Sequence, residues 1–304
     1  MHLITHPDCL RHETPPGHPE RGERLQAVMD RLTESGLLQV LVTRQAHAVT
    51  ASQLAEVHSQ SLIDALTLTS PGDGLVAVDA DTAMGPHSLS AAMHAAGAVV
   101  DGVRAVLNGE TDRAFCAVRP PGHHAEADAA MGFCLYNSIA LGAQAALDQL
   151  ERVAILDFDV HHGNGTVDIF KDRPEVLVCS SFQHPFYPHR YADIRRDNIT
   201  NTPLPACTTG SAFRQAIERD WIPALRDHQP ELILVSAGFD AHAADPLAQL
   251  QLDEEDFRWV SELIVDQANA YARGRVVSAL EGGYDLEALA ASVQVHVEAL
   301  VESS

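Results

Sequence analysis

Short apolar runs alternate along this chain with longer segments in which apolar residues recur every three or four positions. The short runs are rich in Val, Ile and Leu, which predicts strands that are buried on both faces of a sheet. Five such strands are expected, at residues 114–118, 153–160, 176–182, 232–239 and 276–282. Because helical segments separate most of them, the pattern predicts βα units and a parallel sheet covered by helices on both sides.

The longer segments carry recognisable helix signals. Apolar residues at helical spacing mark a first helix around residues 25–32. Thr50 and Gln53 form a capping box that should open a helix continuing to Leu66, and Asp285 is a suitable N-cap for the last helix. Further helices are expected at about residues 88–108, 136–150, 211–227, 253–273 and 285–301.

No repeat, low-complexity tract or linker interrupts this pattern, so a single domain is expected over residues 1–304. The proline-containing segment 183–209 shows no clear period. We expect it to form one long irregular loop, a type of segment that often carries function.

The chain is strongly acidic, with 42 Asp and Glu against 20 Lys and Arg, a net charge of −22. This balance argues against nucleic-acid binding, which needs a basic surface. It suits a cationic small molecule or a lysine-bearing peptide, and equally an acidic surface that only maintains solubility. The five cysteines form no C-x-x-C pair, and we find no secretory leader and no apolar stretch long enough to span a membrane. A cytoplasmic protein without a membrane partner is therefore expected.

Polar side chains follow four of the predicted strands at the point where each strand ends. His123 and His124 follow the strand at 114–118, residues 157–161 close the next one, and Asp240 and Tyr284 follow the last two. In open parallel sheets, ligands bind beyond the carboxyl ends of the strands. The sequence therefore predicts one site to which four strand ends contribute.

Three of these residues have the chemistry of a metal site. Asp159 and His161 are two positions apart in a predicted strand, so both side chains should lie on one face. Asp240 supplies a third ligand from another strand end. Two carboxylates, an imidazole and an open position for water outline a hydrolytic zinc site, although iron(II) suits the same ligands. The alternative is an Asp-x-His pair that caps a loop through hydrogen bonds.

The two histidines lie on a Pro-Pro-Gly loop at residues 119–126. Adjacent imidazoles near a metal-bound water can act as a base and as its electrostatic partner. Each needs another group to fix its tautomer, and Asp157 and Asn164 are available for this. The alternative is a pair of loop histidines that point into solvent.

Several aromatic residues flank the same strand ends. Tyr284 follows Gly282 and a second glycine, which let the backbone approach a ligand closely, and its hydroxyl can donate to a developing oxyanion. Phe133, Phe186 and Tyr187 are candidates for the walls of a narrow tunnel. A tyrosine in an ordinary turn and aromatics in an ordinary core are the alternatives.

Five motifs stand in the order and spacing of the histone deacetylase / acetylpolyamine amidohydrolase family, which the chain resembles from about residue 4 to residue 300. They are RPPGHHA (119–125), MGFCLYN (131–137), DFDVHHGNGT (157–166), SAGFDAH (236–242) and LEGGYD (280–285). HPERGERL (18–25) also matches, and the variants are similar to the class II-like branch. The resemblance implies an arginase-like three-layer α/β/α fold with a central eight-stranded parallel sheet, and zinc-dependent hydrolysis of an acyl-amide.

The resemblance also implies roles for individual residues. Those matching the family's zinc ligands are Asp159, His161 and Asp240. Those matching its catalytic residues are His124 as general base and acid, its partner Asn164, the electrostatic His123 with its partner Asp157, and Tyr284 at the oxyanion. Those matching substrate-binding positions are Gly132, Phe133, Tyr187, Leu247, Gly282 and Arg21, the last near a product channel.

A structural potassium ion is implied as well. Its ligands, mostly backbone carbonyls, would come from Asp157, Asp159, His161, Ser180 and Ser181. A second monovalent site is implied near Phe170, Arg173 and Val176.

Leu247 bears on the substrate. It falls where lysine deacetylases of the family have leucine and where a polyamine-selective relative has glutamate. Because a carboxylate there would attract a second ammonium group, leucine favours Nε-acetyl-lysine in a protein or peptide. An acetylpolyamine or another small acetylated amine is the alternative, and HRYADI (189–194) departs from the Gly-rich turn of relatives, which leaves substrate size open.

Two other functions compete with this one. An arginase-type hydrolase would bind two metals and need a second aspartate in SAGFDAH, which offers only Asp240. A catalytically silent acyl-lysine-binding module would have lost part of the site, whereas ligands, both histidines and Tyr284 are all present. The sequence gives no indication of the oligomeric state.

Overall fold

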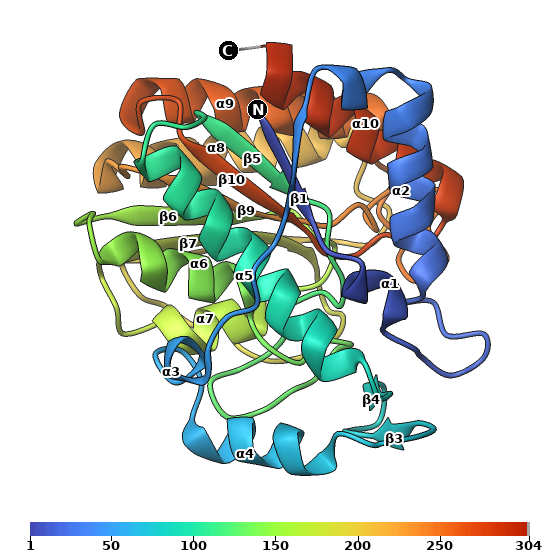
Figure 1. Cartoon of the computed structure of the whole chain (residues 1–304). Coiled ribbons are helices and arrows are strands. Elements are labelled where there is room, and N and C mark those ends of the chain that lie inside the picture. Colours follow the sequence, from blue (N-terminus) through green and yellow to red (C-terminus); the bar gives the residue numbers. More distant parts are fainter. Residues whose placement is uncertain (303–304) are drawn as a thin grey trace.

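In the computed structural model, which describes residues 1–302, eight parallel strands form one central sheet (Figure 1). They are β1 (His2–Thr5), β2 (Val42–Gln45), β5 (Arg113–Cys116), β6 (Val153–Asp157), β7 (Val176–Gln183), β8 (Ile199–Leu204), β9 (Ile233–Ala237) and β10 (Val276–Leu280). Their order across the sheet is β2-β1-β5-β10-β9-β6-β7-β8. Every neighbouring pair is parallel, so all the strands end at the same edge.

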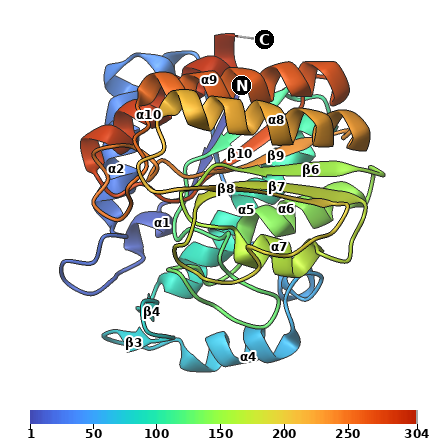
Figure 2. The ribbon, with the colours of Figure 1, turned by 180° about the vertical axis from the view of Figure 1, so that it is seen from behind.

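Helices cover both faces of this sheet (Figures 1 and 2). One face packs against α5 (Ser88–Leu107), α6 (Ser138–Leu147) and α7 (Asn164–Phe170). The other packs against α2 (Gly22–Glu34), α8 (Gly210–His228), α9 (Glu254–Tyr271) and α10 (Leu286–Glu302). The three-layer arrangement follows from the strand sequences, since strands that are apolar on both sides need a cover on both sides.

Smaller elements extend this framework. They are α1 (Asp8–Arg11), a 3-10 turn η1 (Leu37–Gln39), α3 (Ala51–Leu54), α4 (Gln60–Thr69) and an antiparallel pair, β3 (Val76–Ala77) with β4 (Ala83–Met84). The β3–β4 pair and α4 project together beyond α5, at the bottom of Figure 1. Among the described residues, no helix combines the length and the apolar character that crossing a membrane requires.

All five predicted strands form, but three strands of the sheet were not predicted from local pattern. The two strands at the sheet edges, β2 and β8, are the least apolar: β2 is exposed along its whole length, and β8 is only partly buried and contains Pro203. Edge strands need no continuous apolar run, so periodicity does not reveal them. The expectation that 183–209 is one irregular loop was therefore wrong at β8.

The helix signals were confirmed with one correction. The capping box of Thr50 and Gln53 is present, but the helix it opens ends at Leu54. A second helix, α4, begins after Ser59, whose hydroxyl accepts from the backbone of Leu62. The segment expected to be one helix is thus two, because each has its own N-cap. Asp285 caps α10 as expected, accepting from the Ala288 backbone at 2.9 Å.

A buried histidine joins two helices to the central sheet. His296 of α10 lies between the hydroxyl of Ser261 on α9, 2.6 Å from Nδ1, and that of Ser278 on β10, 2.9 Å from Nε2. Burial lowers the pKa of His296 to about 3. The folded protein therefore holds this imidazole neutral, whereas the unfolded chain protonates it near its ordinary pKa of 6.5.

We predict that His296 makes the fold sensitive to acid. Between about pH 6 and pH 4 the unfolded state binds one more proton at this residue, so unfolding becomes easier by about 1.4 kcal/mol per pH unit. In His296→Gln, the slope of the unfolding free energy against pH should fall by about that amount in urea titrations. The exposed His47→Gln is the control; equal slopes in all three proteins would contradict the prediction.

Candidate functional site

The four strands whose ends carry the polar motifs are consecutive in the sheet, in the order β5-β10-β9-β6. The strand β6 ends at Asp157, earlier than expected, so Asp159 and His161 lie in the turn that follows it. That turn, and not a regular strand, brings both side chains towards Asp240. The prediction that these groups meet at one sheet edge is confirmed.

Asp159, His161 and Asp240 form a compact buried group whose ligand atoms lie within 4.8 Å of one another. The Nδ1 atom of His161 is 3.1 Å from Asp159 Oδ1 and 3.1 Å from Asp240 Oδ2. Backbone amides orient the carboxylates: Asp159 Oδ2 accepts from Gly282 at 2.8 Å, and Asp240 Oδ1 accepts from Val160 at 2.8 Å. These bonds leave one edge of each carboxylate facing the imidazole.

Two observations fit a cation at this position. Asp240 Oδ2 is fully buried, and among the described residues no donor makes a hydrogen bond to it, because the nearby His161 Nδ1 is engaged with Asp159 Oδ1. Burial would lower the pKa of His161, but its contacts with Asp159 and Asp240 raise it to about 10. The group thus draws positive charge to the space between the carboxylates. Two carboxylates and an imidazole suit zinc, and also iron(II).

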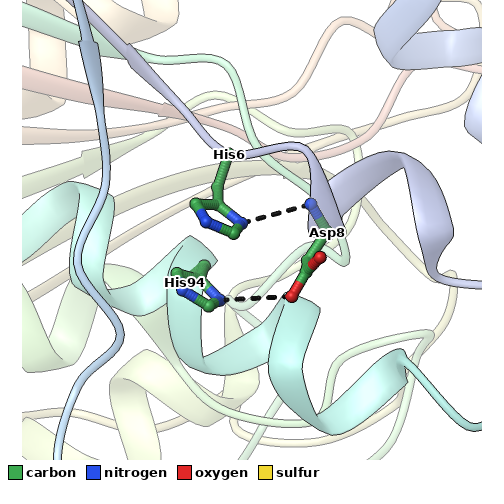
Figure 3. A group of neighbouring side chains, drawn as sticks. All are labelled: His6, Asp8 and His94. Carbon is green, nitrogen blue, oxygen red and sulfur yellow. Dashed lines mark hydrogen bonds and ion pairs between the residues drawn. The ribbon is translucent and has the colours of Figure 1, made fainter.

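A second group of potential ligands lies at the start of α1 and on α5 (Figure 3). The rings of His6 and His94 stack at 3.5 Å beside Asp8. Here the polar atoms already have partners: His6 Nδ1 accepts from the Asp8 backbone, His94 Nδ1 contacts the Ser90 carbonyl at 2.8 Å, and Asp8 accepts from the Ser90 hydroxyl. This group therefore lacks the unsatisfied oxygen that marks the first one.

The neighbouring His123 and His124 have opposite surroundings. His123 Nδ1 lies 3.0 Å from Asp157 Oδ2, and His124 Nδ1 lies 2.7 Å from Asn164 Oδ1. Burial disfavours charge on both, but Asp159 and Asp157 hold the pKa of His123 well above its usual value. Burial and the two neighbouring histidines keep the pKa of His124 well below its usual value. His124 is therefore neutral and can accept a proton.

Tyr284 lines the same cavity as the histidines. Its backbone amide donates to Asp245 Oδ2 at 2.7 Å, and burial raises the pKa of its hydroxyl well above the usual value of 10. The hydroxyl therefore stays protonated and can donate.

The arginine behind Tyr284 is Arg24. Its guanidinium lies 4.9 Å from the ring centre and donates to the carbonyls of Gly283 and Glu281. The expectation for Arg21 was wrong, because Arg21 is exposed at the N-cap of α2.

A cavity of about 220 Å³ leads to these groups. It is lined by Asp81, Pro121, His123, His124, Gly132, Phe133, His161, Phe186, Tyr187, Leu247, Gly282 and Tyr284. The rings of Phe133 and Tyr187 flank it: Phe133 is 6.0 Å from Tyr284, and Tyr187 is 5.2 Å from His124, both edge to face. These aromatics are half-buried, so they are walls of a cavity and not part of the core.

Glycines permit this packing at two places. A Cβ atom on Gly132 would lie 2.4 Å from the His124 ring, and one on Gly282 would lie 2.1 Å from Asp240 Oδ2. No real Cβ atom tolerates such contacts, so both positions require glycine.

Sequence reasoning missed several residues that hold the site together. Asp81 lines the cavity and accepts from the Gly132 amide at 3.1 Å. Glu281 accepts from the amides of Gly122 and His123 and so anchors the histidine loop. Asp81 comes from a loop with no local signal of its own, whereas Glu281 lies within the LEGGYD motif, directly before Gly282.

The residues implied for potassium also lie together, with Asp157 on β6 paired to Ser180 on β7. The residues implied for a second monovalent site surround the side chain of Asn198. The carbonyls of Phe170, Arg173 and Val176 all accept from the amide nitrogen of Asn198, at 2.8–3.0 Å. An amide therefore fills that position.

Comparison with known proteins agrees with this geometry. A sequence model of the histone deacetylase domain matches residues 18–300. The chain belongs to the histone deacetylase family. The crystal structure of an HDA15 HD domain shares the fold with a TM-score of 0.93 and 30% identity, covering 99% of this chain and 88% of that one. The arginase/deacetylase-like fold implied by the motifs is thus confirmed.

Two relatives from microbes bear names that describe an activity. A histone deacetylase-like amidohydrolase of Pseudomonas aeruginosa is 40% identical over 278 residues, 88% of this chain and 73% of that protein. A probable deacetylase of Archaeoglobus fulgidus is 35% identical over 294 residues, 94% and 81% of the two chains. Membership of this hydrolase family supports an enzyme with deacetylase or amidohydrolase activity.

We predict that Gly282→Ala abolishes metal binding. The added methyl group would displace the carboxylates of Asp240 and Asp159, because it would lie 2.1 and 2.6 Å from their Oδ2 atoms. Purified wild-type protein should retain about one equivalent of zinc or iron after dialysis, and Gly282→Ala should retain almost none. Gly72→Ala is the control, since its Cβ would meet no atom within 4 Å. Equal metal content in both variants would contradict the assignment, and two equivalents in the wild type would favour the arginase-type alternative.

Proposed function

We propose that this protein is a zinc-dependent deacetylase that hydrolyses Nε-acetyl-lysine in proteins or peptides. The observation that carries the proposal is the meeting of three kinds of group at the end of one cavity. They are the ligand set of Asp159, His161 and Asp240, the neutral His124 and the protonated Tyr284. A metal site, a general base and an oxyanion donor together supply the groups for metal-dependent hydrolysis of an amide.

A zinc ion held by Asp159, His161 and Asp240 would polarise the acyl carbonyl and acidify a bound water molecule. His124 takes the proton from the attacking water through Nε2, because its Nδ1 is engaged by Asn164. The Tyr284 hydroxyl donates to the oxygen that becomes negatively charged. His124 then returns the proton to the leaving amine, while His123, held in place by Asp157, keeps a positive charge beside the site.

The shape of the cavity supports a slender, largely uncharged side chain. Phe133 and Tyr187 present ring faces and edges that suit the methylene groups of an acyl-lysine, and Leu247 lies at the same cavity without a charge. An acetylpolyamine would bring a second ammonium group, for which Leu247 offers no partner. Among the described residues, Asp81 is the one carboxylate in the lining, and its Oδ1 already accepts from the Gly132 amide and the Thr82 hydroxyl. We propose a structural potassium ion at the residues around Asp157 and Ser180. The five free cysteines support a reducing compartment such as the cytoplasm.

The direct test compares initial rates on a fluorogenic Nε-acetyl-lysine peptide and on N-acetylputrescine, with and without a chelator. We expect hydrolysis that the chelator abolishes and a higher kcat/KM for the peptide. A preference for N-acetylputrescine would make the protein a polyamine amidohydrolase. Binding of the peptide without hydrolysis, with zinc present, would favour the catalytically silent module.

Leu247→Glu should shift this preference towards the polyamine. A carboxylate at the cavity would pair with the second ammonium of N-acetylputrescine, an interaction of about 1 kcal/mol, or about fivefold in kcat/KM. The ratio of the two kcat/KM values measures this shift. Leu247→Gln, which introduces a side chain of similar size without a charge, is the control. An equal shift in both variants would show that the charge at position 247 does not determine the substrate preference.

Tyr284→Phe should reduce kcat by about a hundredfold to a thousandfold, equivalent to about 2.7–4 kcal/mol, because an oxyanion donor is lost. The zinc content should stay unchanged, since Tyr284 is not among the ligands. Tyr271→Phe at the far end of α9 is the matched control. Undiminished turnover of Tyr284→Phe on the peptide would remove the hydroxyl from the mechanism.

A further inference from the structure

Behind His124 lies a buried carboxylate to which the mechanism above gives no role. Glu126 is 5% exposed and is engaged at both oxygens. Its Oε1 accepts from Asn164 Nδ2 at 2.7 Å, and its Oε2 accepts from the guanidinium of Arg190 at 2.7 Å. A chain of side chains therefore runs from Arg190 through Glu126 and Asn164 to His124.

This chain determines the direction of the Asn164 amide. An asparagine side chain has a donor end and an acceptor end, and turning it over exchanges them. A carboxylate accepts and does not donate, so Glu126 requires that the Nδ2 end face it. The other neighbours of Nδ2 are also acceptors, the His124 carbonyl at 3.3 Å and Met131 Sδ at 3.4 Å. Oδ1 is consequently the atom that faces His124.

The direction of the amide in turn fixes the tautomer of His124. Because Asn164 Oδ1 accepts at 2.7 Å, Nδ1 of His124 must carry the hydrogen. Nε2 then keeps its lone pair, and it is the nitrogen left to act as a base. With the amide reversed, Nδ1 would have to accept, and the hydrogen would move to Nε2.

The outer end of the chain lies in the segment 187–191, which carries the cavity wall Tyr187 and reaches the surface at Arg190; we call this segment the cavity mouth. Arg190 is three residues after the cavity wall Tyr187, and its side chain is 52% exposed. The next residue, Tyr191, donates to Asp168 Oδ1 at 2.8 Å on α7, the helix that begins at Asn164. Two consecutive side chains thus attach the mouth of the cavity to the residues behind His124.

We infer that Glu126 is a positioning residue of the reaction, which sets the proton of His124 on Nδ1 by orienting Asn164, and that Arg190 secures Glu126 from the cavity mouth. The inference rests on the proposed hydrolysis for its kinetic consequences. The nearby carboxylates of Asp128 and Asp168 do not make this group a metal site. Both oxygens of Glu126 are already paired, as are both of Asp168, with Tyr191 and with the Ala127 amide.

A pair of substitutions exchanges donors and acceptors along the chain. Glu126→Gln can present either end of its amide, so the direction of Asn164 is no longer imposed. We expect kcat to fall about tenfold or more, with KM within about twofold, as for other residues that orient a functional group. Asn164→Asp places two carboxylates face to face and should also lower kcat.

The double variant Glu126→Gln/Asn164→Asp should recover most of the lost kcat. The amide introduced at position 126 would then donate to the carboxylate introduced at position 164, which would still accept from His124 Nδ1. A role in packing alone predicts no such recovery. A double variant no better than the worse single variant would overturn the inference.

Arg190→Ala tests the outer contact without disturbing a buried residue. We expect kcat on the peptide to fall by up to about fivefold, the range of an exposed ion pair. Arg195→Ala is the matched control from the stretch just after the cavity mouth, since its guanidinium donates only to the adjacent Ile194 carbonyl among the described residues. Equal kcat in the two variants would remove Arg190 from the inference.

Ring nitrogen-15 spectra of histidine-labelled protein test the tautomer without any substrate. With the His124 signals assigned from a His124→Gln spectrum, the wild type and the double variant should show the hydrogen on Nδ1. Glu126→Gln should show a mixture of tautomers. If the wild type hydrolyses neither substrate, the proposed function fails while these spectra still decide the role of Glu126. An unchanged Nδ1–H signal in Glu126→Gln would overturn it.

Discussion

Three carboxylates, Asp157, Asp159 and Asp240, are buried side by side at the end of the sheet, each no more than 1% exposed. Negative charge in such a place is costly unless positive charge or several donors surround it. Backbone amides from Asp159, Val160, His161 and Gly282 satisfy part of the need. The remainder falls on His123, on His161 and on the cation proposed for this site. The arrangement of the loops around the site follows from this requirement.

The same requirement explains why the pKa values of the adjacent His123 and His124 are shifted in opposite directions. His123 faces Asp157 and Asp159, so positive charge on its ring is stabilised. His124 faces the uncharged Asn164 and has two other imidazoles near it, so positive charge on its ring is opposed. One dipeptide therefore supplies a charged residue and a neutral base, because its two side chains diverge towards different partners. Separating the pKa values of neighbouring groups in this way is common in acid–base catalysis.

The central strands and the metal group were predictable from sequence because their signals are local. Buried parallel strands are continuous apolar runs, and polar residues stand out at their ends. The strand order that makes β5, β10, β9 and β6 neighbours depends on crossovers, and no local pattern contains it. Arg24 could have been found, since it recurs with Val28 and Leu32 at helical spacing on the buried face of α2, whereas Arg21 precedes that helix. Glu281 could have been found as well, since it lies in the LEGGYD motif at a strand end. Asp81 reaches the site from a loop whose path is set by tertiary contacts, so its role could not be predicted.

Two carboxylates outside the group of Asp159, His161 and Asp240 connect the residues at the cavity entrance to the residues proposed for catalysis. Asp245 accepts from the Leu247 amide at 2.9 Å with one oxygen and from the Tyr284 amide at 2.7 Å with the other. The residue proposed to discriminate substrates and the residue proposed to donate to the oxyanion are thus held by one side chain. Glu126 does the same behind His124, where it joins Arg190 of the cavity mouth to Asn164. Because the loops at the mouth are fixed to the groups behind the site, a change of loop sequence that alters specificity also disturbs the alignment of the reacting groups.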